Sequence, residues 1–236
     1  MLPRGRAAPT AQERTRMTKL SREEPLALAG PAGRLEALAY APVDPQGAAL
    51  LLHPHPLYGG NLHNKVVFTA QRVCADLGLA TLRFNFRGVG ASGGRYDDGQ
   101  GEQDDARAAL VHLAERWPAT SLYLVGFSFG AWIALRVGSA RADVAGLAAI
   151  GTPVDWAPLD FLADSAVPKL FVHGDEDQYC DPEGLRRAYP GFAPPKRLEW
   201  IAGADHFFTS RLEALSLALR EQFPLPAVAW RRSPSA

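Results

Sequence analysis

Three kinds of reactive side chain stand just after apolar, strand-like runs of this sequence. Ser128 follows the run "LYLV", an acidic stretch that contains Asp177 follows "KLFV", and His206 follows "RLEWI". Ligands of a parallel sheet bind beyond the carboxyl ends of its strands, so these side chains are expected to meet at one edge of a sheet. A histidine held by a carboxylate can take the proton of a serine hydroxyl and make that hydroxyl a nucleophile.

The setting of Ser128 favours a nucleophile over simple close packing. The stretch "GFSFGA" matches G-x-S-x-G, in which the serine sits at a sharp turn between a strand and a helix. Such a turn strains the backbone and requires small residues two positions away on each side, here Gly126 and Gly130. The helix that follows would direct its amide groups and the positive end of its dipole at the same point. Small residues also let a helix lie close to a sheet, which is the alternative interpretation.

His206 is the best candidate for the base among the six histidines. It lies in "GADHFF", after the last predicted strand and before the last predicted helix, and a capping or core histidine is the alternative interpretation. His173 is expected to serve the turn at the end of its own strand. The stretch "HGDEDQYCDP" offers the carboxylates of Asp175, Glu176, Asp177 and Asp181. Spacing alone leaves Asp175 as a rival of Asp177 for the acid that orients the base.

Acyl transfer also needs N–H donors for the oxyanion that develops on the substrate. The backbone N–H of Phe129, directly after the serine, is the predicted first donor. The second donor should come from the loop "HPHPLYGGN", in which Pro54 and Pro56 have no amide hydrogen. Leu57 is therefore the first choice for the second donor, and His55 is the runner-up.

The sequence predicts neither a metal site nor a disulfide framework. His53, His55 and His63 lie close together, but no cysteine or carboxylate accompanies them and prolines stiffen the loop. Two cysteines cannot form a disulfide framework. Cys74 falls on an apolar stripe with helical spacing and is expected to be buried. Cys180 stands in a polar loop and is expected to be the more exposed of the two.

The elements that must position these residues alternate along the chain. Strands are predicted at 34–42, 48–53, 79–86, 121–126, 144–150, 169–174 and 197–203. Helices are predicted at about 62–77, 102–117 and 129–140, and a last helix carries Leu212, Leu215, Leu219 and Phe223 along one side. Continuous apolar strands separated by amphipathic helices indicate an α/β protein with a mostly parallel sheet and helices on both faces.

We interpret residues 34–224 as a single domain. Residues 1–33 are expected to form a flexible N-terminal extension that leads into the first strand, and residues 225–236 a C-terminal tail. Residues 1–20 lack the apolar middle section of a secretory signal. The sequence leaves open whether translation starts at Met1 or at Met17.

Charge and hydropathy exclude several classes of partner. Lys plus Arg and Asp plus Glu each total 25, so the net charge is zero and no global field would recruit nucleic acid or an anionic membrane. The longest apolar runs are far shorter than the roughly 18 residues that a bilayer span needs. The sequence therefore predicts a soluble, cytoplasmic protein that binds a small molecule and has no nucleic-acid or membrane partner. It leaves the oligomeric state open.

The joint pattern of motifs resembles the α/β-hydrolase superfamily over nearly all of residues 34–224. The motifs are "HPHPLYGG", "FNFRGVGASGG", "GFSFGA", "HGDEDQYCDP" and "GADHFF". Within the superfamily the chain is most similar to small, single-domain bacterial hydrolases related to dienelactone hydrolase. Members of that group commonly have a cysteine nucleophile. Ser128 stands in its place here, which favours ester or thioester cleavage over lactone opening.

The resemblance implies a Ser-His-Asp triad of Ser128, His206 and Asp177. In the family the acid usually stands at the last aspartate of an "HGxxD" run, which here spans residues 173–177. The resemblance also implies that "RGVGAS" is a structural turn beside the site rather than a phosphate loop. It implies no cofactor.

These observations predict a serine hydrolase that cleaves small carboxylic esters or thioesters through an acyl-enzyme intermediate. A peptidase or amidase, and a non-catalytic binding protein of the same fold, are the alternatives. The segment 151–167 is too short for a multi-helix lid, so no large lid is expected and specificity should level off after a few acyl carbons. The candidates to line an acyl pocket are Trp156, Phe161, Tyr179 and Phe207.

Overall fold

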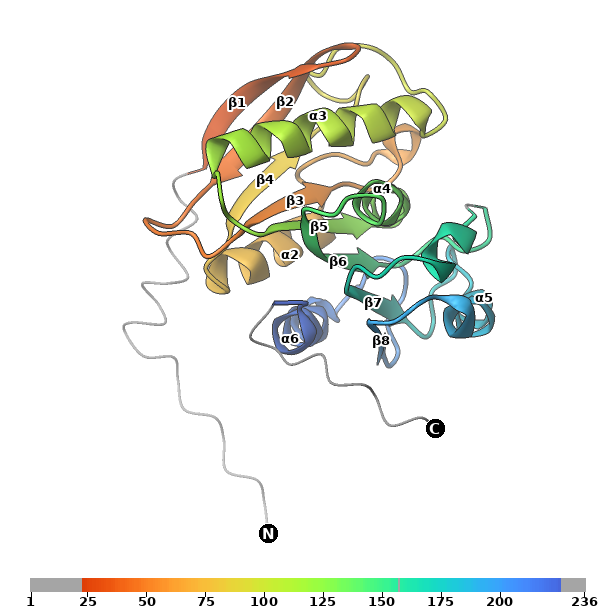
Figure 1. Cartoon of the computed structure of the whole chain (residues 1–236). Helices are drawn as coiled ribbons and strands as arrows, with labels where there is room; N and C mark the ends of the chain where they lie inside the picture. Colours follow the sequence, from red (N-terminus) through yellow and green to blue (C-terminus); the bar gives the residue numbers. More distant parts are fainter. Residues whose placement is uncertain (1–22, 157, 226–236) are drawn as a thin grey trace.

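The computed structural model describes residues 23–156 and 158–225, whose backbone contains one eight-stranded sheet (Figure 1). The strand order across the sheet is β1-β2-β4-β3-β5-β6-β7-β8. β2 runs antiparallel to both of its neighbours, and all other neighbouring strands are parallel. The strands are β1 (Glu24–Gly30), β2 (Gly33–Tyr40), β3 (Ala48–Leu52), β4 (Ala80–Phe84), β5 (Leu122–Phe127), β6 (Val144–Ile150), β7 (Lys169–Gly174) and β8 (Lys196–Ile201). The α-helices are α2 (Lys65–Asp76), α3 (Gln100–Arg116), α4 (Phe129–Gly138), α5 (Pro182–Ala188) and α6 (Leu212–Gln222).

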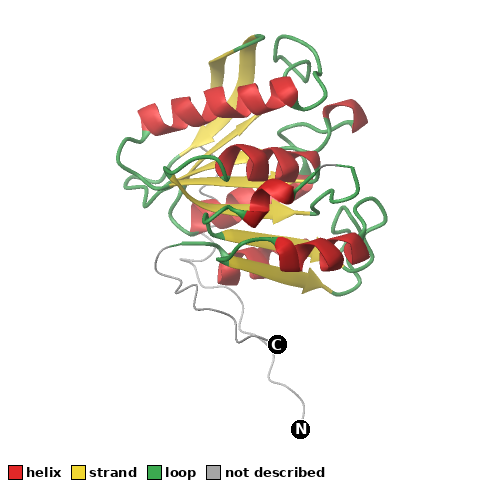
Figure 2. Cartoon of the chain, turned by 45° about the vertical axis from the view of Figure 1, so that its right-hand side comes forward, coloured by secondary structure: helices red, strands yellow, loops and turns green. Residues whose placement is uncertain are grey.

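Helices cover both faces of this sheet, as Figure 2 shows from a second direction. α3 and α4 pack against one apolar core, and α2 and α6 pack against the other. Successive side chains of a strand point to opposite faces, so the fully buried strand β3 supplies both cores. Leu50 and Leu52 enter the first core, and Ala49 and Leu51 enter the second. The predicted α/β architecture, with a mostly parallel sheet covered on both faces, is confirmed.

The folded domain begins earlier than the sequence pattern predicted. β1 starts at Glu24, inside the stretch 1–33 that was interpreted as a flexible extension, and it pairs with β2 in a hairpin. β1 is an edge strand with one buried side chain, Leu28, and its exposed positions Ala27 and Ala29 carry alanine, so no alternation of polar and apolar residues marks the strand in the sequence. The short helix α5 was also not predicted. Residues 1–22, with both candidate start methionines, and the predicted tail beyond Leu225 lie outside the described residues.

A buried ion pair fixes the chain just before β1. The Arg83 side chain on β4 is 2% exposed, and its guanidinium donates to both carboxylate oxygens of Glu23 at 2.7 and 2.8 Å. The same guanidinium donates to the backbone carbonyl of Leu62 at 2.5 Å. A buried charge is costly without a partner, so Glu23 is part of the folded domain.

The segment between β6 and β7 forms no helical lid. Its described residues contain one short 3₁₀ helix, η3 (Asp160–Ala163). This arrangement confirms the expectation that the chain has no large lid, and the carboxyl ends of the central strands stay accessible. Within the described ranges, every helix is too short or too polar to cross a membrane.

The Glu23–Arg83 pair can be tested with two neighbouring carboxylates. Glu23→Ala should lower the free energy of unfolding by about 3 kcal/mol, because it leaves the buried Arg83 charge without a carboxylate partner. Glu24→Ala is the matched control. Glu24 forms a more exposed ion pair with Arg116, which is worth less than about 1 kcal/mol. Urea unfolding followed by circular dichroism measures both, and equal losses would contradict the assignment of Glu23 to the folded domain.

Candidate active site

Ser128 lies at the turn from β5 to α4 with a strained backbone. Its φ of 54° and ψ of −120° fall outside the regions that residues with a side chain prefer, and such strain costs about 1–3 kcal/mol. Surrounding bonds hold the strained conformation. The Ser128 N–H donates to the carbonyl of Ile150 at 2.8 Å, and the Ser128 carbonyl accepts from Ala131 and Trp132 at 2.8 and 3.2 Å.

Two glycines make this turn possible. A Cβ atom added to Gly126 would lie 2.1 Å from the carbonyl oxygen of Gly130. A Cβ atom added to Gly130 would lie 2.3 Å from the carbonyl oxygen of Leu52 on β3. Both contacts are with backbone atoms, which cannot turn away as a flexible side chain can. The structure thus gives the physical reason for small residues two positions before and after Ser128.

Asp177 and His206 form a buried hydrogen-bonded pair. The Nδ1 atom of His206 lies 2.8 Å from Oδ2 of Asp177, and the other carboxylate oxygen accepts from the backbone N–H groups of Tyr179 and Cys180 at 2.9 and 2.8 Å. Burial alone would raise the pKa of Asp177, but the bonds from His206 and the two N–H groups lower it below its ordinary value. The ionised carboxylate accepts the Nδ1 proton, so Nε2 of His206 is left to accept another.

Asp175, the rival left open by spacing, serves a different turn. Its Oδ1 atom accepts from the backbone N–H of Gly203 at 2.7 Å, after β8.

His173 lies behind the acidic loop, as expected of a residue that serves the turn. Its Nε2 donates to the carbonyl of Cys180 at 2.9 Å and lies 3.6 Å from Oδ2 of Asp177. Burial lowers the pKa of His173, which keeps the ring neutral.

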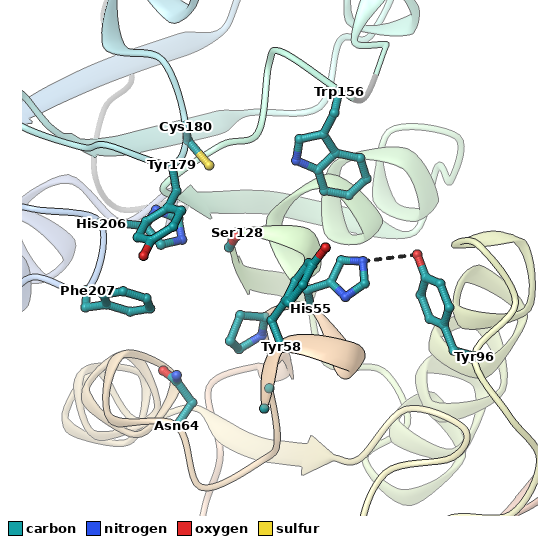
Figure 3. A pocket seen from close by; sticks show the side chains of 13 residues that line it. His55, Tyr58, Asn64, Tyr96, Ser128, Trp156, Tyr179, Cys180, His206 and Phe207 are labelled. Atoms are coloured by element: carbon teal, nitrogen blue, oxygen red, sulfur yellow. Dashed lines mark hydrogen bonds between the residues drawn. The ribbon is translucent and has the colours of Figure 1, made fainter.

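Ser128 and His206 line the same cavity, which has a volume of about 750 Å³ (Figure 3). The structure shows no hydrogen bond between these two described side chains. Bonds of this kind often shorten only when substrate binds. The other side chains and backbone segments of the lining are Pro54, His55, Tyr58, Gly59, Gly60, Asn64, Tyr96, Trp156, Tyr179, Cys180 and Phe207.

Three of the four predicted pocket residues line this cavity, namely Trp156, Tyr179 and Phe207. The prediction for Phe161 was wrong. Its ring lies 4.7 Å beneath the guanidinium carbon of Arg136 and packs against the apolar core on the α4 side of the sheet. Sequence reasoning also missed two tyrosines of the lining, Tyr58 and Tyr96. Tyr58 ends the three-residue 3₁₀ helix η2 (Pro56–Tyr58) and Tyr96 lies in a glycine-containing loop, so no periodicity marks either side chain.

Both cysteines are buried, Cys74 at 1% and Cys180 at 2% exposure, so the polar loop exposes Cys180 hardly more than α2 exposes Cys74. Cys180 is 2% exposed, because the polar loop folds back so that its N–H reaches Asp177 and its carbonyl accepts from His173. Burial raises the pKa of the Cys180 thiol, which borders the cavity as a neutral group. Cys74 is buried on α2, as predicted.

The structure favours a different second oxyanion donor in the loop after β3 from the one that the sequence favoured, Leu57. The N–H of Leu57 already donates to Nδ1 of the His55 ring at 3.2 Å, which disfavours Leu57 as an oxyanion donor. Among the described residues, the backbone N–H of His55 has no hydrogen-bond acceptor. Neither does the N–H of Phe129, because the first amides of a helix have no partner within it. The runner-up, His55, therefore fits the second donor position better.

His53 does not have a nitrogen free for a metal ion. Its Nδ1 donates to the carbonyl of Pro54 at 2.6 Å, and its Nε2 accepts from the backbone N–H of Phe86 at 3.0 Å. Burial lowers the pKa of His53 to about 4. Within the described residues, the ligand-type side chains that gather within 4.8 Å of one another are Asp177, Cys180 and His206. The Asp177–His206 hydrogen bond already accounts for most of this proximity.

Comparisons with known proteins identify the family. A family model described as "Alpha/beta hydrolase domain" matches residues 48–217. The uncharacterized protein RP471 of Rickettsia prowazekii is 39% identical over 202 residues, which are 81% of this chain and 85% of that protein. The chain therefore belongs to the α/β-hydrolase family, as the motifs predicted.

Two solved structures extend this likeness. An α/β serine hydrolase homologue from Coxiella burnetii is 38% identical, with a TM-score of 0.81 over 85% of this chain and 97% of that one. The protein XC6422 from Xanthomonas campestris, described as an α/β serine hydrolase without lid, is 35% identical, with a TM-score of 0.79 over 86% and 94% of the two chains. The fold, the family match and the similar structures together support the conclusion that the protein is a hydrolase.

The close approach at Gly130 can be tested without an activity assay. Gly130→Ala should lower the free energy of unfolding by about 1–3 kcal/mol or more, because its methyl group would overlap the Leu52 carbonyl. Gly191→Ala is the matched control, since a Cβ at exposed Gly191 meets nothing within 4 Å. Urea unfolding of the two variants measures the difference. Equal stability would mean that the elbow can relax to admit a side chain.

Proposed function

We propose that the protein is a serine hydrolase that cleaves small carboxylic esters or thioesters with a triad of Ser128, His206 and Asp177. The observation that carries the proposal is the 2.8 Å hydrogen bond between His206 and Asp177 at a cavity that Ser128 also lines. The strained backbone of Ser128 supports it further, because such strain gathers at functional sites.

In the first half of the reaction, the Ser128 Oγ atom attacks the carbonyl carbon of the ester. The hydroxyl proton moves to Nε2 of His206, and the Asp177 carboxylate stabilises the imidazolium that forms. The carbonyl oxygen becomes an oxyanion. The backbone N–H groups of Phe129 and His55 then donate to this oxyanion, at the amino end of α4 where the helix dipole is positive.

In the second half, the tetrahedral intermediate collapses. The bond to the alcohol or thiol breaks, His206 gives its proton to the departing oxygen or sulfur, and the acyl group stays on Ser128 as an ester. A water molecule then attacks this acyl-enzyme and loses its proton to His206. Expulsion of Ser128 Oγ, which takes the proton back, releases the carboxylic acid and restores the enzyme.

The open cavity supports small substrates. In the described residues between β6 and β7 the helical structure is limited to the short η3, so a long linear chain would leave most of its methylenes in water. Each methylene left in water forgoes about 0.8 kcal/mol of burial free energy. Specificity for linear acyl chains is therefore expected to level off after a few carbons.

The nucleophile can be identified by variation and by labelling. Ser128→Ala should reduce kcat/KM for 4-nitrophenyl acetate at least about 10³-fold, because nucleophile and base act as a unit. A fluorophosphonate should add one adduct to the peptide that contains Ser128. Ser139→Ala, at the opposite end of α4, is the matched control and should retain activity. Labelling elsewhere would contradict the role of Ser128, and a chain that hydrolyses no ester would be a binding protein.

The acid can be identified by comparing two aspartates of one loop. Asp177→Asn should slow turnover about 10³- to 10⁴-fold while the protein stays folded, because an amide no longer fixes the tautomer of His206. Asp175→Asn should slow turnover far less, since Asp175 bonds to Gly203 instead. Circular dichroism and ester hydrolysis measure the two effects. The reverse ranking would assign the acid to Asp175.

A further inference from the structure

Aromatic rings lie on both sides of Ser128 in the cavity (Figure 3). The rings on the side of His206 are those of Tyr179 and Phe207. The rings on the opposite side are those of His55, Tyr58, Tyr96 and Trp156. The described lining contains no aspartate, glutamate, lysine or arginine. The cavity is therefore suited to flat, uncharged groups.

Exposed aromatic side chains gather at this cavity. Nine large apolar side chains of the described residues are exposed, and four of them line it. These four are Tyr58 (86% exposed), Trp156 (49%), Tyr179 (62%) and Phe207 (38%). Apolar surface that is exposed around a hollow marks a place where a ligand covers it.

The rings of His55 and Trp156, opposite His206, contact neighbouring groups before any ligand binds. The His55 ring is fixed at both nitrogens, since Nδ1 accepts a backbone N–H and Nε2 lies 3.1 Å from the hydroxyl of Tyr96. Its centroid lies 4.7 Å from the ring of Tyr58 and 6.1 Å from that of Trp156. Trp156 is stacked on Phe129 at 6.0 Å and 10°. Rings fixed in this way lose little freedom when another ring packs on them.

The proposed mechanism assigns the two sides of the cavity to the two parts of an ester. The departing oxygen must reach Nε2 of His206, so the leaving group lies on the side of Tyr179 and Phe207. The acyl carbon is bonded to Ser128, and its substituent extends the other way, toward Tyr58 and Trp156. The aromatic wall around His55 is therefore the acyl side.

We propose that this cavity selects esters and thioesters whose acyl group is an uncharged aromatic ring, such as benzoyl, which packs against Trp156 and Tyr58. This inference rests on the proposed serine-hydrolase function. Aromatic pairs gain free energy beyond the burial of their area, so a flat ring should be preferred to a saturated ring of the same carbon count.

The test compares 4-nitrophenyl benzoate with 4-nitrophenyl cyclohexanecarboxylate, which share a leaving group and differ in the flatness of the acyl ring. Each kcat/KM is divided by the rate of alkaline hydrolysis of the same ester, and the ratio of the benzoate value to the cyclohexanecarboxylate value should be about three to ten. Trp156→Leu and Tyr58→Leu should each lower this benzoate-to-cyclohexanecarboxylate ratio at least halfway toward one. A ratio near one in the wild type would overturn the inference and leave the serine hydrolase in place.

Two control variants separate the acyl side from the rest of the protein. Phe68→Leu changes an exposed aromatic residue of α2 outside the cavity lining and should leave the ratio as in the wild type. Tyr179→Leu changes the leaving-group side and should also leave the ratio unchanged. A ratio that falls in Tyr179→Leu but not in Trp156→Leu would overturn the assignment of the acyl side.

A binding measurement separates this inference from the catalytic proposal. Benzamide and cyclohexanecarboxamide are uncharged and can be titrated into the Ser128→Ala variant while its tryptophan fluorescence is followed. Benzamide should bind at least about threefold more tightly. If the wild type hydrolysed no ester but this preference held, the catalytic proposal would fail, and only the preference of the cavity for a flat, uncharged ring would stand. Equal affinity of the two amides would count against the selectivity itself.

Discussion

The close contact between the start of α4 and the strands beneath it is the constraint on which the site depends. No side chain fits between Gly126 and Gly130, or between Gly130 and the backbone of Leu52. Because the start of α4 lies this close to β3 and β5, the chain must turn sharply at Ser128, where φ is positive. The same contact places the first amide of α4, that of Phe129, directly after Ser128 and without an acceptor among the described residues. The strained serine and its unpaired neighbouring amide thus both follow from one packing contact.

The remaining polar groups are positioned by loops whose hydrogen bonds are nearly complete. Both oxygens of Asp177 are engaged, one by His206 and the other by two backbone N–H groups. His173 closes the same loop from behind by donating to the carbonyl of Cys180. Such a network leaves few alternative arrangements, because breaking any bond would strand a buried polar atom. The loop that carries Asp177 therefore fixes the orientation of the His206 ring.

The predicted fold followed from periodicity, and the choice of Ser128 and His206 from their positions after strands, whereas the choice of Asp177 over Asp175 came from the family resemblance. What could not be predicted involves pairings between distant or irregular segments. β1 belongs to the domain through its pairing with β2, and Glu23 just before it bonds to Arg83, a partner far along the chain that no local pattern identifies. The Leu57 amide is taken by a side chain of its own loop. The loop that contains Cys180 is polar in sequence, yet it folds so that Cys180 is buried. The ring of Phe161, in the short helix η3, packs under Arg136 and away from the cavity.

The strand order also has a consequence for synthesis on the ribosome. The loop after β3 and the turn after β5 are made first, whereas His206 follows β8, the last strand at the far edge of the sheet. Ser128 and His206 are roughly 80 residues apart, so at typical elongation rates the histidine that we propose as the base is added about 4–16 s after the serine. The serine and the histidine of the proposed triad are thus synthesised several seconds apart, and they meet only after β8 has joined the sheet.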